Sequence, residues 1–266
     1  MLASIRGTRI FFDIDGAGFV PDGDRLKERP ILFLLHGGPG GDHTGFRGAN
    51  SELRDVAQLV YVDHRGCGRS DTGNPADYTL ENNIDDLDAL RAHLGLETIS
   101  VLGSSYGGMV AIGYALRYPK RVANLILVCT AASYRFLDDA QKLLAERGTP
   151  EQIQVCRRLW DGNFDSMEQL RDYYRVMGPL YSRKFQPEDF DAGWNRGRRS
   201  YLAISINKNQ AAARLPWHSR EIADAIPRAH LKIFDHSGHS VAADEPAEYL
   251  RAIRGFLTYA TPPNGH

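Results

Sequence analysis

Cysteine, net charge and long hydrophobic runs are all scarce in this sequence of 266 residues. Its three cysteines are too few and too scattered for a disulfide framework or a zinc site. The formal net charge of −1 gives no electrostatic reason to expect binding to nucleic acid or to an anionic membrane. No apolar run approaches the length of a membrane span, and the N-terminus has no signal-peptide pattern. We therefore expect a cytoplasmic protein with no nucleic-acid or membrane partner.

The remaining composition is that of an ordinary globular protein, with 42% hydrophobic and 24% charged residues. A chain of this length can bury one large core, or one core together with an inserted lobe. Short apolar runs alternate with helical patterns in its first half, which predicts a mostly parallel sheet with helices on both faces. The expected strands cover 4–7, 9–15, 31–35, 59–62, 98–102 and 122–129, and the expected helices cover 46–57 and the stretch from Thr79, a typical N-cap, to Gly95, a typical C-cap.

The pattern changes after residue 131. Helical periodicity without a buried strand predicts a helical lobe over 133–206 that covers the active site. Aromatic residues of this lobe either line the site or fill the lobe's own core; they are Tyr173, Tyr174, Trp194 and Tyr201. The α/β pattern then returns, with a helix over 217–226, a strand over 230–234 and a last helix from about Pro246. The expected division is a first core part (1–133), a helical cap insertion with a shortened connection (134–214) and a last core part (215–266).

The strongest chemical signal is a G-x-S-x-G motif between an expected strand and an expected helix, formed by Gly103, Ser105 and Gly107. A serine at the tip of so tight a turn has strained backbone, and side chains two positions away on either side would collide. Were Ser104 the nucleophile, those positions would carry Leu102 and a tyrosine. Ser105 is therefore the candidate nucleophile, although Gly-Ser clusters are also ordinary loop sequences.

A second glycine-rich turn, over 36–41, follows the expected strand 31–35. Glycine lets backbone N–H groups approach a ligand closely, and in a hydrolase such a turn supplies one half of an oxyanion hole. The donors would be Gly37 or Gly38 together with Tyr106, the residue after the nucleophile. A plain tight turn is the alternative. We interpret His36 as a structural histidine that holds this loop.

A serine hydroxyl needs an adjacent base, and in this arrangement the histidine follows the last strand. His239 stands at that place, whereas His236 comes too early and is expected to face solvent or to cap the strand. In the charged loop after the strand 59–62, we expect Asp63 and Arg65 to pair and to fix the loop.

Three segments together resemble the proline iminopeptidase branch of the α/β-hydrolases, and tricorn-associated aminopeptidases in particular. They are H-G-G-P-G at 36–40, D-H-R-G-C-G-R-S at 63–70 and G-S-S-Y-G-G at 103–108. The resemblance covers roughly residues 1–133 and 217–260, and the lobe matches only in kind. His64 stands where the family usually has glutamine.

The resemblance implies an α/β-hydrolase fold and a serine-hydrolase mechanism without a metal or an organic cofactor. Ser105 would be the nucleophile and His239 the base, and the N–H groups of Gly37 and Tyr106 would form the oxyanion hole. Family members release N-terminal residues, often proline, from short peptides, and close relatives cleave esters, amides or lactones. The expected partner is a small-molecule or short-peptide substrate.

The stretch between Ile206 and Trp217 departs from the family pattern. The family has another buried strand here, followed by a loop with the acid of the catalytic triad, but 207–216 contain neither an apolar run nor an Asp or Glu. We infer that one late strand and its acid loop, about 30 residues at typical element lengths, are missing. A replacement acid would come from Asp138 or Asp139, in the loop after the strand 122–129, whereas Asp224 and Asp244 are weaker candidates because helix geometry points them away; none of the four is favoured.

The leading interpretation is thus a serine hydrolase that forms an acyl-enzyme, resembling a proline iminopeptidase. The alternatives are an esterase or lactonase of the same fold, or a catalytically impaired member without the triad acid. An aminopeptidase must bind the ammonium group of its substrate. Glu151, Glu168 and Glu188 of the lobe are available for this, although acidic residues of a helical lobe more often form a solvated face.

Overall fold

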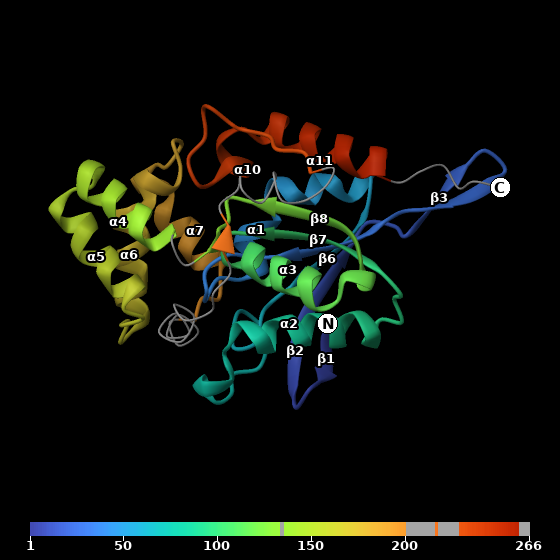
Figure 1. The fold of residues 1–266 in the computed structure, drawn as a ribbon, viewed down its shortest axis with the longest axis horizontal. Helices are drawn as coiled ribbons and strands as arrows, with labels where there is room; N and C mark the ends of the chain where they lie inside the picture. The colour runs from blue at the N-terminus through green and yellow to red at the C-terminus, as the bar shows by residue number, and fades with distance from the viewer. Residues whose placement is uncertain (134–135, 201–215, 218–228, 261–266) are drawn as a thin grey trace.

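The computed structural model describes residues 1–133, 136–200, 216–217 and 229–260. A six-stranded sheet forms its centre, in the order β1-β2-β6-β5-β7-β8 (Figure 1). The last four strands in this order are parallel to one another, whereas β1 and β2 form an antiparallel hairpin that joins them through β2 and β6. The strands are β1 (Leu2–Ile5), β2 (Thr8–Asp15), β5 (Ile31–Leu35), β6 (Gln58–Val62), β7 (Ile99–Ser104) and β8 (Val122–Val128). The mostly parallel sheet is as predicted.

The central strands are buried on both faces because their side chains alternate between two cores. Phe33 and Leu35 of β5 pack with α2 (Leu80–His93) and α3 (Tyr106–Arg117). Leu32 and Leu34 point the other way and pack with η1 (Ala49–Asp55) and α11 (Pro246–Ala260). Figure 1 shows the two faces of the sheet covered by these two sets of helices.

Two predicted helices had different outcomes. For α2 the prediction is confirmed, since the side chain of Thr79 accepts the N–H of Asn82 and Gly95 follows the helix with a φ of 70°. The single helix predicted over 46–57 is wrong. The chain forms α1 (His43–Arg47) and then η1, because Gly48 between them has a φ of 13° and a ψ of −121°, outside the helical region.

Four helices, α4 to α7, form a group at one end of the sheet, which we call the cap (Figure 1). They have a hydrophobic core of their own, centred on Leu170 and Tyr173. The predicted helical lobe is confirmed over its described part, and Tyr201 lies outside the described residues. The cap helices are α4 (Phe136–Arg147), α5 (Pro150–Trp160), α6 (Met167–Tyr181) and α7 (Phe190–Arg196).

The late part of the chain departs from prediction. Residues 230–234 form no strand, and Leu231 and Ile233 are 47% and 50% exposed. A parallel strand needs a neighbouring strand. The neighbour expected from the family pattern would stand between Ile206 and Trp217, where the sequence offers no apolar run and where 207–215 lie outside the described residues. Within the described residues β8 pairs only with β7, and its side chains are half-buried rather than buried.

The remaining elements are short. A helix was predicted over 217–226, but Trp217 belongs to β10, which pairs antiparallel with β9, and 218–226 lie outside the described residues, as do 207–215. The short elements are a hairpin of β3 (Phe19–Asp22) and β4 (Arg25–Glu28), β9 (Ala132–Ser133), β10 (Pro216–Trp217), the single turns η2 (Pro75–Asp77), η3 (Pro119–Arg121) and η4 (Pro187–Asp189), and α10 (Val241–Asp244).

Candidate active site

Ser105 stands at the turn between β7 and α3, in strained backbone. Its φ is 53° and its ψ is −120°, a combination that residues with a side chain rarely adopt. Two hydrogen bonds hold the turn: the N–H of Ser105 donates to the carbonyl of Val128 (3.0 Å), and Thr130 Oγ1 donates to the carbonyl of Ser105 (2.7 Å). This is the sharp strand-to-helix turn that the motif predicts.

The two motif glycines have the steric role that the sequence predicts. A Cβ on Gly103 would lie 2.3 Å from the carbonyl oxygen of Gly107, and a Cβ on Gly107 would lie 2.2 Å from that of Leu35. Both obstacles are backbone atoms, which cannot move aside as a flexible side chain could. The turn therefore tolerates only glycine at these two positions.

The glycine-rich turn after β5 runs beside Ser105. A Cβ on Gly37 would be 3.1 Å from the Cβ of Ser105, and Gly38 has a φ of 133°. Tyr106 begins α3 and its phenol points into the core, where it accepts a hydrogen bond from Asn83 Nδ2 (2.7 Å). Tyr106 is the first residue of α3 and follows Ser105 directly. At the first turn of a helix the backbone N–H groups point out of the N-terminal end instead of bonding within the helix. The predicted oxyanion donors thus come from two elements that meet at Ser105.

His36 is buried and holds this turn. Its Nδ1 bonds the carbonyl of Gly37 (2.8 Å), and its Nε2 accepts the backbone N–H of His64 (3.2 Å). Burial lowers the pKa of His36, which favours the neutral ring that this pair of bonds requires. The structural role predicted for His36 fits these contacts.

The predicted pairing of Asp63 with Arg65 is wrong. Asp63 accepts the N–H of Arg69 (2.9 Å) and bonds Nδ1 of His43 (2.9 Å), so it joins its own loop to α1. Arg65 instead makes two hydrogen bonds to Asp86 of α2, at 2.7 and 2.8 Å. The loop is fixed by charges, but the partner of the arginine comes from a distant helix.

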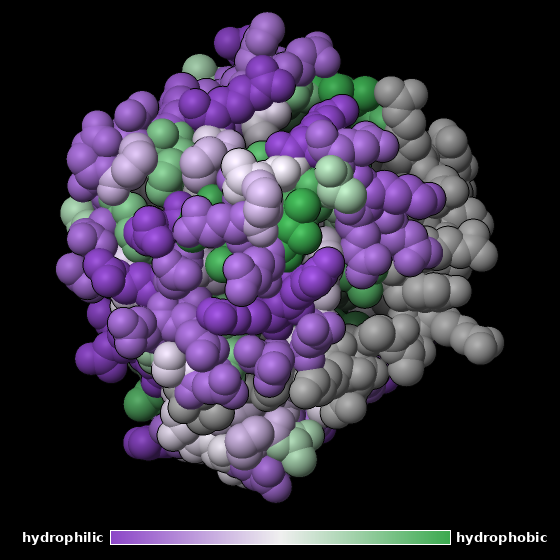
Figure 2. Space-filling view, turned by 90° about the vertical axis from the view of Figure 1, so that its left-hand side faces the viewer, coloured by the Kyte–Doolittle hydropathy of each residue, from purple (hydrophilic) through white to green (hydrophobic). Residues whose placement is uncertain are grey.

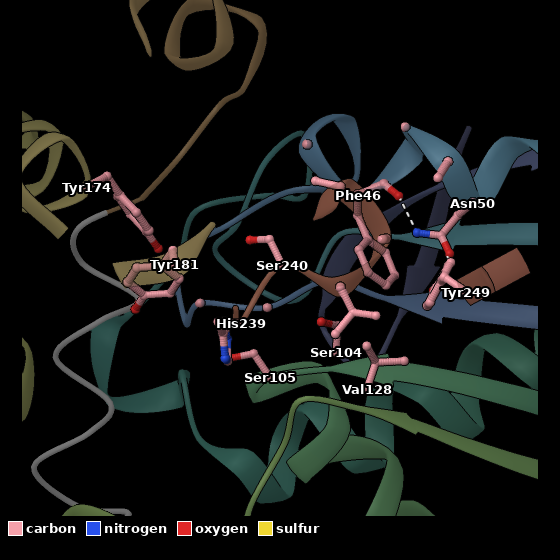
Figure 3. A pocket seen from close by; sticks show the side chains of 18 residues that line it. Phe46, Asn50, Ser104, Ser105, Val128, Tyr174, Tyr181, His239, Ser240 and Tyr249 are labelled. Carbon is pink, nitrogen blue, oxygen red and sulfur yellow. Dashed lines mark hydrogen bonds between the residues drawn. The ribbon is translucent and has the colours of Figure 1, made fainter. Parts of the chain in front are cut away.

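The ring of His239 faces Ser105. Figure 3 shows the serine hydroxyl and the imidazole pointing toward one another across the end of a pocket. The ring also meets the edge of Tyr181 from α6, with ring centroids 5.1 Å apart and an interplanar angle of 88°. Burial lowers the pKa of His239. His236, by contrast, is exposed, as predicted, and its N–H donates to Glu245 Oε1 (3.1 Å).

No carboxylate of the described residues pairs with His239. Asp244 is buried but accepts hydrogen bonds from Ser182 and from the N–H of Gly238 (2.7 Å). Asp138 and Asp139 are exposed on α4, where Asp139 lies 4.0 Å from Lys142. Asp224 lies outside the described residues. The acid that the sequence lacks is therefore not supplied by the three candidates that the structure describes.

A cavity of about 340 Å³ opens between the sheet and the cap, with Ser105 and His239 in its wall. At its far end Tyr249 donates to Asn50 Oδ1 (2.6 Å), and Asn50 donates to the carbonyl of Phe46 (2.7 Å) (Figure 3). Every described residue of the wall is uncharged. The wall is formed by Gly37, Gly38, Gly45, Phe46, Gly48, Ala49, Asn50, Ser104, Ser105, Val128, Tyr174, Tyr181, His239, Ser240, Val241, Ala242, Ala243 and Tyr249.

The cap contributes to this wall less than its aromatic content suggests. Tyr174 lines the cavity, whereas Tyr173 is 2% exposed inside the cap and Trp194 packs against the cap's core. Sequence reasoning missed Tyr181, which reaches the cavity from the last turn of α6. The sequence feature that could have indicated Tyr181 is its position near the end of an amphipathic helix. The outer face of the cap is mainly hydrophilic (Figure 2).

The described residues contain no group of three or more His, Cys, Asp or Glu side chains able to hold a metal ion. None of their helices is both long and apolar enough to cross a membrane.

Residues 30–191 match the model of the alpha/beta hydrolase fold family. The chain belongs to this family. It is similar to the proline iminopeptidase of Lactobacillus helveticus (35% identity, covering 87% of this chain and 90% of the relative). Among solved structures it resembles the proline iminopeptidase of Mycobacterium smegmatis (18% identity, 98% of each chain, TM-score 0.72) and an esterase from Exiguobacterium antarcticum (20% identity, 97% and 98%, TM-score 0.70). The predicted resemblance to proline iminopeptidases within the α/β-hydrolases is confirmed.

Proposed function

We propose that this hydrolase acts through an acyl-enzyme formed on Ser105. His239 takes the proton from the serine hydroxyl as its oxygen attacks the substrate carbonyl, and then gives that proton to the leaving group. Water, deprotonated by the same ring, releases the acid and restores the serine. The N–H groups of Gly37 or Gly38 and of Tyr106 stabilise the oxyanion. The observation that carries the proposal is the strained backbone of Ser105, with the ring of His239 facing it (Figure 3).

The lack of a carboxylate paired with His239 among the described residues sets the expected rate. In complete triads the acid orients the histidine and stabilises its charged form, and losing the correct tautomer lowers kcat by about 10⁴-fold. We therefore expect turnover far below that of a complete triad, but above background.

A fluorophosphonate probe tests the nucleophile directly. Ser105 should be labelled, Ser105→Ala should abolish labelling, and Ser104→Ala should retain it as the matched control. Mass spectrometry of the labelled peptide identifies the residue. An unlabelled wild-type protein that is folded by circular dichroism would contradict the enzyme proposal and favour a catalytically inactive member.

Two substrate classes are in question, and different observations favour them. Relatives named proline iminopeptidase, one of them 35% identical, support an aminopeptidase for short peptides. Against this, Glu151, Glu168 and Glu188 are exposed on the cap and none of them lines the cavity. A wall without charge, over the residues described, suits an uncharged acyl group better than an ammonium. An esterase is therefore the second candidate.

Paired substrates decide between these classes. An aminopeptidase should release aniline from a prolyl-anilide but not from its N-acetylated form, because the free ammonium is what it recognises. An esterase should cleave a short aryl ester and leave the prolyl-anilide intact. The Ser105→Ala variant measures the background for both substrates.

A further inference from the structure

The turn that ends α6 makes direct contact with the loop that carries His239. The N–H of Ser240 donates to the carbonyl of Tyr181 (2.8 Å). On the other side of the histidine, the N–H of Gly238 donates to Asp244 Oδ2 (2.7 Å), and the same oxygen accepts the N–H of Arg183 (3.2 Å). The residues before and after His239 are thus both attached, directly or through Asp244, to the cap turn 181–184.

Asp244 is the centre of this junction. It is 5% exposed, and its second oxygen accepts the hydroxyl of Ser182 and the N–H of Lys184 (3.3 Å). Burial alone would raise the pKa of Asp244, but the hydrogen bonds from Ser182 and from the three backbone N–H groups hold it below its ordinary value. Burying a carboxylate and four hydrogen-bond donors lowers stability unless each donor is paired, and here all four donate to Asp244.

The junction also fixes the ring. Tyr181 belongs to the same turn, and its edge meets the imidazole of His239 with centroids 5.1 Å apart. Its phenol is held in turn by a 2.8 Å hydrogen bond to the phenol of Tyr173 in the cap's core. Backbone and ring of His239 are therefore both oriented by contacts with the cap.

We propose that Asp244, by joining the cap turn 181–184 to the loop 236–240, positions His239 for proton transfer, while no carboxylate of the described residues bonds the imidazole itself. This inference rests on the proposed roles of Ser105 and His239. Asp244 is a positioning residue, because its oxygens are bonded to backbone N–H groups and a serine rather than to the imidazole. The cap then contributes to the base as well as to the substrate cavity.

Two substitutions of Asp244 separate positioning from simple stability. Asp244→Ala removes all four acceptor contacts. In Asp244→Asn the amide oxygen can still accept the N–H groups of Gly238 and Arg183. The amide NH₂ group would then face Ser182, whose hydroxyl can accept a hydrogen bond from it. Glu245→Gln is the matched control, since Glu245 bonds the N–H of His236 and the hydroxyl of Ser237 in the same loop. If Asp244→Ala does not fold, Ser182→Ala removes one donor and should act in the same direction, more weakly.

The rate of fluorophosphonate labelling of Ser105 is the first readout. Displacing a catalytic group by about 1 Å costs on the order of 10²-fold in rate. We expect such a loss for Asp244→Ala, a smaller loss for Asp244→Asn, and a rate within about threefold of wild type for Glu245→Gln.

The pKa of His239 is the second readout, and it does not depend on activity. The titratable and polar side chains that share the cavity wall with its ring include the phenols of Tyr181, Tyr174 and Tyr249 and the hydroxyls of Ser105 and Ser240, and none of the described wall residues is charged. Burial therefore sets the pKa, and releasing the loop into water should raise it toward the ordinary histidine value. A histidine ¹H NMR titration, assigned with His239→Gln, measures this shift in Asp244→Ala.

The outcomes are distinguishable. A wild-type protein that is not labelled contradicts the proposed function, while the NMR shift alone still decides the positioning role. A folded Asp244→Ala that is labelled as fast as wild type, with an unchanged His239 pKa, overturns the positioning role and leaves the proposed function intact.

Discussion

The region that holds Ser105 and the region that holds His239 are built in different ways. Ser105 follows a strand that is hydrogen-bonded on both sides, to β5 and to β8, and buried from both faces. His239 follows residues 230–234, which form no strand and are largely exposed. The nucleophile is held by the sheet, whereas the base is held by hydrogen bonds to the cap.

The difference shows what the sheet supplies to a catalytic turn. A strand with two neighbours cannot shift without breaking two ladders of hydrogen bonds, so the turn that follows it can keep a strained conformation. Before His239 the described residues form no strand, and hydrogen bonds of a few polar groups hold the loop instead. We therefore expect the two regions to respond differently to substitution.

The largest difference is expected from equivalent truncations of apolar residues. Leu34 in β5 is 0% exposed, and Leu34→Ala should lower the free energy of unfolding by about 2–5 kcal/mol. Ile233, in the segment predicted as a strand, is 50% exposed, and Ile233→Ala should change it by no more than about 0.5 kcal/mol. Urea unfolding followed by circular dichroism measures both. A loss of more than 2 kcal/mol for Ile233→Ala would mean that this segment is buried like the rest of the sheet.

A single methyl group in the serine turn should come next. Gly107→Ala places a Cβ 2.2 Å from the carbonyl oxygen of Leu35, and the backbone must shift to admit it. We expect a destabilisation of about 3 kcal/mol and loss of labelling at Ser105. Gly73→Ala is the control, because a Cβ there has nothing within 4 Å, and it should behave as wild type in both measurements.

Falling pH should destabilise the serine region through its buried histidines. Burial lowers the pKa of His36 and of His64 below 6.5, so the unfolded chain binds protons that the native state does not. Stability should therefore decrease as pH falls below about 6.5, by up to about 1.4 kcal/mol per pH unit for each histidine. His64→Gln should reduce this slope and the exposed His236→Gln should not. Equal slopes in the two variants would show that His64 is not buried in neutral form.

The smallest effect is expected at the exposed histidine of the late loop. His236→Ala should leave the labelling rate of Ser105 within about twofold of wild type, because only its backbone N–H is used. His239→Ala should abolish labelling under the same conditions. If the two variants had the same effect, the assignment of the base to His239 would fail.

The sequence predicted well whatever depends on local patterns. The runs that became β5, β6 and β7, the caps of α2 and the glycines around Ser105 each carry their cause within a few residues. Gly48 could have revealed the break between α1 and η1, since glycine is a poor helix former, but the apolar spacing on both sides favoured one helix.

Non-local pairing is where prediction failed. Residues 230–234 have the composition of a strand, yet a strand forms only beside a partner strand. Which partner is present depends on the fold of the whole chain and cannot be read from these five residues. Arg65 had an acid two positions away, but its partner is Asp86, from a helix that folds back over the loop. The absence of an acid between Ile206 and Trp217 and the orientation of Asp244 away from the imidazole could be predicted, but no pattern indicated that Asp244 would accept the N–H of Gly238.

The described contacts that hold the serine turn lie early in the chain. Gly37 and Leu35 approach it from one side, Val128 and Thr130 from the other, and none of these residues follows position 130. On the ribosome, where chains begin to fold from their N-terminus, these four residues are all synthesised before the cap and the loop of His239. The order of synthesis thus separates the two catalytic groups in time: the strained serine turn can form first, and the base arrives only once the cap has emerged to receive it.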